Sequence, residues 1–64
     1  MNWIDISKNE IHGTFAGHNE PVFVLKRESE SPYFWVMTGL YEDRSQYRND
    51  LKSQADYYVS NILK

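Results

Sequence analysis

The sequence predicts an α+β domain in which a small antiparallel β-sheet is followed by one C-terminal amphipathic helix. Two apolar runs between residues 22 and 40 are rich in β-branched and aromatic residues, which is typical of strands. A later stretch places apolar residues three and four apart, as on one face of a helix. The chain has only 64 residues, so we expect a single domain spanning residues 1–64.

The first 20 residues predict one or two short strands and a loop. Apolar residues at positions 3, 4 and 6 favour a first strand, and residues 7–9 have the composition of a turn. Ile11, Gly13 and Phe15 then alternate as in a second strand. The following segment mixes Gly, Asn and Pro, which favours a loop. The sheet should therefore have three strands, or four.

Residues 22–27 and 33–40 are the two clearest predicted strands. The polar segment 28–32 ends in Pro32 and suits a hairpin loop between them. Gly39 is expected to mark the end of the second strand or a bulge in it, because glycine weakens a strand interior.

The C-terminal third predicts the helix. Asp43 followed three residues later by Gln46 has the pattern of a capping box, which indicates a helix start. Asn49 and Asp50 are weak helix formers, so the alternative is a start several residues later. The predicted buried stripe consists of Tyr47, Leu51, Ala55, Tyr58 and Ile62.

The sheet carries more apolar surface than one helix can cover. Successive strand residues point to opposite faces, and both faces of residues 33–40 are apolar: Tyr33, Trp35 and Met37 on one, Phe34, Val36, Thr38 and Leu40 on the other. Two explanations compete: the N-terminal segment folds over the second face, or another chain covers it, in a homodimer or with a different protein. The predicted partner-binding residues are Tyr33, Trp35, Met37 and Tyr57, the last of which lies off the helix stripe.

Three basic residues form a second candidate site. Arg44, Arg48 and Lys52 are spaced four apart, which would align them along one face of the predicted helix. Such a basic stripe can meet phosphates or an acidic protein surface. A solvated charged face is the alternative interpretation.

Composition argues against several other functions. The net charge of −2 does not favour nucleic-acid or membrane attraction, and no apolar run approaches the ~20 residues of a membrane span. The chain has no cysteine, and His12 and His18, with Glu10 and Glu20 nearby, do not match a metal-ligand spacing. No serine has the context of a catalytic nucleophile. We therefore expect a cytoplasmic protein that is not an enzyme and has no metal or other cofactor.

The function predicted from these features is that of a small, non-catalytic protein-binding module. Aromatic residues make up 16% of the chain and are the types enriched at interface centres. Such a module would act as an inhibitor or regulator by docking on a larger protein or blocking it sterically. In size and character it is similar to virus-encoded inhibitors, including those of phages. The alternative is a nucleic-acid-binding or regulatory protein that uses the basic stripe.

Overall fold

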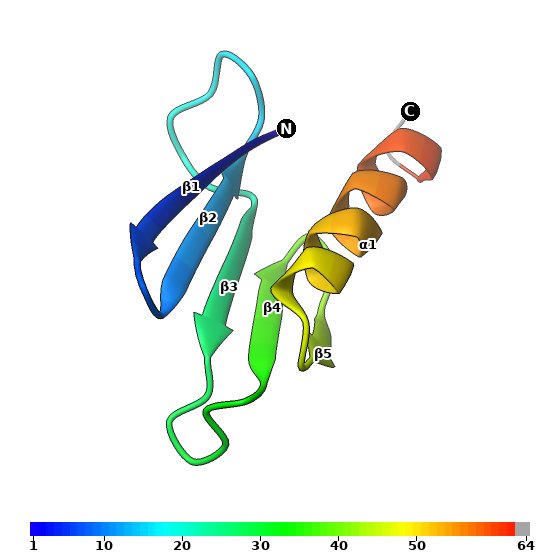
Figure 1. Ribbon diagram of the computed structural model, residues 1–64. Helices are drawn as coiled ribbons and strands as arrows, with labels where there is room; N and C mark the ends of the chain where they lie inside the picture. Colours follow the sequence, from blue (N-terminus) through cyan, green and yellow to red (C-terminus); the bar gives the residue numbers. More distant parts are fainter. Residues whose placement is uncertain (63–64) are drawn as a thin grey trace.

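The computed structural model describes residues 1–62 and shows a five-stranded antiparallel sheet with one helix against one of its faces (Figure 1). Each strand pairs with its neighbour in the sequence, so the strand order is β1-β2-β3-β4-β5. The α+β prediction is confirmed, with more strands than expected. The elements are β1 (Asn2–Ser7), β2 (Glu10–Thr14), β3 (Phe23–Arg27), β4 (Trp35–Gly39), β5 (Asp43–Ser45) and α1 (Arg48–Asn61).

The N-terminal segment extends the sheet instead of folding over it. β1 and β2 form a hairpin in which Trp3 pairs with Gly13, and the register shifts at a bulge between Asp5 and Ser7. β2 in turn pairs with β3. A Cβ atom at Gly13 would lie 2.5 Å from Cζ3 of Trp3, so the missing side chain lets the indole ring pack closely on β2. The segment therefore does not cover the second sheet face.

Gly39 ends β4, as the sequence indicates. Its φ of 123° lies in a region that side chains other than glycine rarely adopt, and a Cβ atom here would collide with the carbonyl oxygen of Val22. The next residue, Leu40, donates its backbone N–H to that same oxygen at 3.1 Å. Glycine thus allows the chain to turn toward β5 while staying close to the start of β3.

The segment that resembled a helix cap is a strand. Asp43–Ser45 forms β5 and pairs with Trp35–Met37 of β4, so the capping-box interpretation of Asp43 and Gln46 is wrong. The helix begins at Arg48, several residues later, which was the alternative. Its N-cap, Tyr47, makes no side-chain cap hydrogen bond. Pairing with β4 satisfies backbone groups that an early helical turn would have left open, and this favours the extended form.

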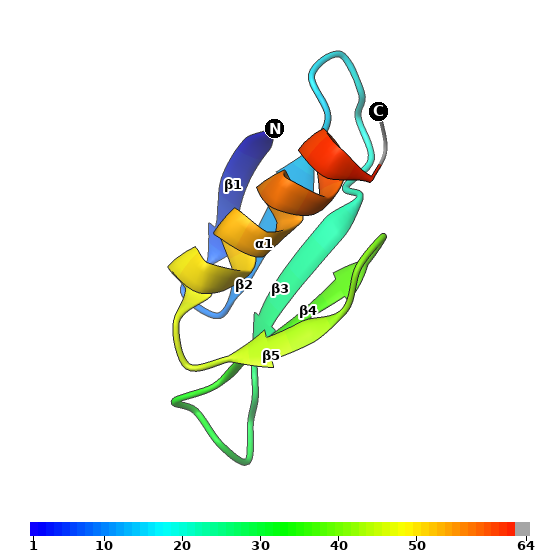
Figure 2. The ribbon, with the colours of Figure 1, turned by 90° about the vertical axis from the view of Figure 1, so that its right-hand side faces the viewer.

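The core lies between the helix and the face of the sheet that carries the bulkier side chains. It consists of Ile11, Phe23, Leu25, Trp35, Met37, Leu51 and Ala55, all buried. Trp3, Val22, Tyr58 and Val59 pack around this cluster and are partly buried. Figure 2 shows α1 crossing in front of the strands, which places Leu51 and Ala55 over the sheet. This single apolar layer is the hydrophobic core of the described chain.

The opposite sheet face is open and of mixed character. The strand pairing places Ile4, His12, Val24 and Thr38 in one row across it, and Glu10, Lys26, Val36 and Arg44 in the next. Within residues 1–62 no element lies over these rows. The face is less apolar than we expected, because the large residues of β3 and β4 point to the helix and mainly β-branched residues point away.

Candidate functional site

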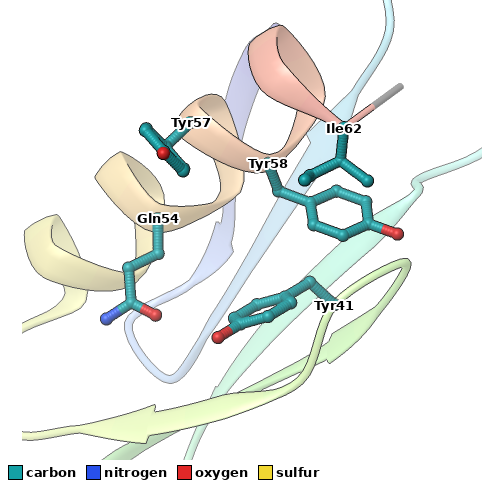
Figure 3. Close-up of a pocket in the computed structure, with 5 residues that line it drawn as sticks. All are labelled: Tyr41, Gln54, Tyr57, Tyr58 and Ile62. Atoms are coloured by element: carbon teal, nitrogen blue, oxygen red, sulfur yellow. The ribbon is translucent and has the colours of Figure 1, made fainter. Parts of the chain in front are cut away.

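A concave apolar surface lies beside the C-terminal half of α1. A cavity of about 260 Å³ is lined by Tyr41, Gln54, Tyr57, Tyr58 and Ile62, and we call it the tyrosine groove. Tyr41 comes from the connection between β4 and β5, Gln54, Tyr57 and Tyr58 come from the helix, and Ile62 is the residue at its C-cap. Figure 3 shows the ring of Tyr41 lying below that of Tyr58, with Ile62 above. The groove thus joins two separate parts of the chain.

The floor of the tyrosine groove is anchored to the core. The rings of Tyr41 and Tyr58 lie 5.4 Å apart between centroids, with an angle of 38° between their planes. Tyr58 in turn meets Phe23 edge to face at 6.4 Å. Such aromatic pairs restrict side-chain rotation and add to the stabilisation from burial. These contacts hold Tyr41 and Tyr58 in place at the base of the groove.

The rim of the groove remains exposed. Tyr57 is 68% exposed and Ile62 is 61% exposed, although both carry large apolar surfaces. The five lining residues offer three phenol hydroxyls and one amide, with no carboxylate, imidazole or thiol. This surface can supply apolar contact area and a few hydrogen bonds at its edge.

The structure separates the four residues that the sequence suggested as partner anchors. Tyr57 lies in the tyrosine groove, and Tyr33 lies in the loop between β3 and β4, where it is 81% exposed. Trp35 and Met37 are core residues, 4% and 0% exposed beneath the helix. They share a face with Phe23 and Leu25, so the helix covers the row that the sequence assigned to a partner. Neither side chain protrudes as an anchor for a partner while the helix is packed.

The three basic residues do not form one stripe. Arg44 belongs to β5 and points to the open sheet face, where its guanidinium lies 3.8 Å from the ring centroid of Phe34. Arg48 and Lys52 belong to α1. Arg48 lies near Trp35, and the Lys52 ammonium lies 6.0 Å from the ring of Trp3. The helical alignment fails because the helix starts after Arg44.

Arg44 is occupied by an acidic partner. Its Nε donates to Glu28, and its Nη2 donates to the second Glu28 oxygen at 3.1 Å. This two-point hydrogen bonding lowers the pKa of Glu28 and raises the pKa of Arg44. The pair ties β5 to the end of β3 on the open face.

The two histidines lie in different settings. His12 is on the open sheet face, where its Nε2 is 2.5 Å from a carboxylate oxygen of Glu10. His18 is in the loop after β2, where it meets Phe15 edge to face at 5.9 Å. Among residues 1–62 there is no cluster of three or more side chains suited to hold a metal ion. Nor does this part of the chain contain a helix long and apolar enough to cross a membrane.

Most of the tyrosine groove was not foreseen from the sequence: Tyr58 and Ile62 were assigned to the buried stripe, and of the five lining residues only Tyr57 was predicted to meet a partner. Only the middle of that stripe is covered: Leu51 and Ala55 are fully buried, while Tyr47 and Ile62 are exposed. A helix of 14 residues is about 21 Å long, and a five-residue strand spans only about 17 Å. This difference in length is the signal that would have indicated that the two ends of the apolar stripe extend past the sheet and are exposed.

Comparisons with protein-family models, with curated proteins and with solved structures found no match to this chain. The functional argument therefore rests on the geometry of the groove and of the surfaces around it.

Proposed function

We propose that this chain is a non-catalytic protein-binding module that docks on a larger protein through the tyrosine groove. The observation that carries the proposal is an apolar hollow with three tyrosines in its lining. Tyrosine is among the residues that most often dominate binding energy at interfaces. It supplies a large contact area while having only two side-chain torsions to immobilise.

The geometry favours an aliphatic or aromatic side chain of a protein segment as the occupant. The hollow of about 260 Å³ is smaller than the roughly 300–1,000 Å³ of most small-molecule sites. Phenol hydroxyls and the Gln54 amide stand ready to bond the backbone of a segment that inserts such a side chain (Figure 3). Docking of this kind would inhibit or regulate the larger protein by blocking its surface.

The arrangement of the basic residues gives no similar support to nucleic-acid binding. Arg44 lies on the open sheet face, apart from Arg48 and Lys52 on the helix, and it is already paired with Glu28. Phosphate backbones are usually met by a continuous basic surface. We therefore put protein binding first.

Affinity capture with matched variants tests the proposal. The wild-type chain, Tyr57→Ala and Tyr33→Ala would each be used to capture proteins from the native host, and any partner would be purified for affinity measurement. Tyr57→Ala should weaken binding by more than about 1 kcal/mol, and Tyr33→Ala should not, although Tyr33 is the more exposed tyrosine. If both variants lost affinity equally, or if Tyr57→Ala lost none, the partner would bind elsewhere than in the groove.

Sedimentation of the isolated chain at high micromolar concentration tests whether the partner is a second copy. A dimer that Tyr57→Ala dissociates would make the groove a self-association surface. A monomer would leave a different protein as the occupant.

A further inference from the structure

A second cavity lies at the opposite end of the helix and has a different chemistry. It measures about 340 Å³ and is lined by Arg27, Trp35, Gln46, Tyr47, Arg48 and Asn49. Every one of these side chains carries a hydrogen-bond donor, and none is a carboxylate. A hollow with so many donors and no acidic group is suited to an anion.

Two arginines line the cavity, and the guanidinium group of each lies near the same aromatic ring. The Cζ atoms of Arg27 and Arg48 lie 4.9 Å and 5.9 Å from the ring centroid of Trp35. Trp35 is buried in the core, so this ring forms a fixed floor that orients both arginines. The two residues come from the end of β3 and the start of α1, which the fold brings together.

Neither arginine has an acidic partner. Within residues 1–62 no carboxylate lies within 4.0 Å of Arg27 or Arg48. The Arg27 guanidinium donates only two long hydrogen bonds, both at 3.4 Å, to the carbonyl oxygens of Pro32 and Lys8. In contrast, Arg44 on the other sheet face is bound to Glu28 by two nitrogens. The cavity therefore holds two positive charges that the described chain does not neutralise.

We propose that this cavity binds a phosphate monoester or inorganic phosphate dianion. Phosphate of this kind carries a charge of about −1.5 to −2 at pH 7 and at least three acceptor oxygens. Two guanidinium groups, each with a planar pair of N–H donors, match that charge and geometry. A carboxylate has only two oxygens and one negative charge, so one guanidinium group is enough to pair with it. Gln46 and Asn49 add neutral donors at the rim. This cavity shares no residue with the tyrosine groove. A failure to bind phosphate would therefore leave the proposed protein binding untouched, and a failure to bind protein would leave the phosphate site untouched.

NMR titration of the full chain tests the proposal. The Trp35 indole N–H and the Nε–H groups of Arg27 and Arg48 would be followed during addition of inorganic phosphate, O-phosphoserine or acetate, with chloride holding the ionic strength constant. Phosphate and O-phosphoserine should give saturable shifts at these three groups, and acetate should bind about tenfold more weakly. Shifts no larger than those in chloride alone, or equal binding of acetate and phosphate, would overturn the assignment.

Variants identify the residues responsible. Arg27→Gln and Arg48→Gln should each weaken phosphate binding about tenfold, because each removes charge-assisted hydrogen bonds. Arg27→Lys keeps the positive charge but loses the paired N–H donors of the guanidinium group. Its affinity for phosphate should therefore lie between those of the wild type and Arg27→Gln. The matched control is Arg44→Gln, which should leave binding unchanged. Loss of binding in the control but not in Arg27→Gln or Arg48→Gln would refute the proposal.

The source of the phosphate is read from the same titrations. Tighter binding of O-phosphoserine than of inorganic phosphate indicates a phosphorylated side chain, and the reverse order indicates free phosphate. A single-stranded oligonucleotide that competes more strongly than either, with steep salt dependence, would contradict a dianion site and indicate a phosphodiester backbone instead.

Discussion

Replacing Met37 with alanine should destabilise the fold strongly. Met37 is fully buried and belongs to the core cluster beneath α1. Removing a buried side chain of this size costs about 2–5 kcal/mol, since both transfer energy and packing are lost. A chain of 64 residues is expected to have a free energy of unfolding of only about 3–10 kcal/mol. The substitution should therefore remove a large part of the stability, or all of it.

Urea unfolding followed by circular dichroism measures the effect. For an m-value of about 1 kcal/mol/M, the midpoint should fall by about 2 M or more. Thr38→Ala is the matched control, because Thr38 is the next residue of β4 but is exposed on the open face. It should change stability by less than about 1 kcal/mol. A loss below about 0.5 kcal/mol for Met37→Ala would mean that its side chain is at the surface, and would refute the assignment of the helix to this face.

Three other perturbations test separate parts of the structure. Gly39→Ala should destabilise the fold by at least about 1 kcal/mol in thermal or urea unfolding, since it combines a strained φ with a collision at Val22; an unchanged midpoint would contradict the turn geometry. Tyr47→Ser should stabilise the helix by about 1 kcal/mol, because the N-cap lacks a side-chain hydrogen bond, and a lower melting temperature would argue against Tyr47 as the cap. The pKa of Glu28 is lowered by Arg44, so its stabilisation is present above the unfolded-state pKa and is lost as the pH falls through the folded-state pKa. Glu28→Gln should therefore flatten the acid limb of the stability profile, whereas an identical profile would show that the ion pair does not contribute.

Strands β3 and β4 were predictable because their signal is local. Both begin with aromatic and β-branched residues and carry further large apolar residues, and alternation assigned their side chains correctly to two faces. The local sequence did not indicate which face of the sheet the helix would cover. The covered face depends on which row packs best against Leu51 and Ala55, and the bulkier row, with Trp35 and Met37, was selected.

The start of the helix shows how a local pattern can be overridden by pairing. The spacing of Asp43 and Gln46 fits a helix cap, but the backbone of β4 offers hydrogen bonds to this segment. That alternative is visible only once the sheet is assembled. Because residues 43–45 pair with β4, Arg44 lies outside the helix, and the predicted basic stripe does not form. The cavity around Arg27 and Arg48 was unpredictable for a related reason, because the two side chains beside one ring lie 21 positions apart in the sequence.

The strand order has a consequence for how quickly the chain finds its fold. Every strand hydrogen-bonds only to its neighbours along the sequence, so each pairing closes a short loop. Short loops carry small entropic costs, and chains dominated by such contacts cross the folding barrier faster than sheets built from distant segments. Although more of its described residues lie in strands than in the helix, this chain should fold on the timescale of mixed α/β domains, faster than β-sandwiches of similar stability.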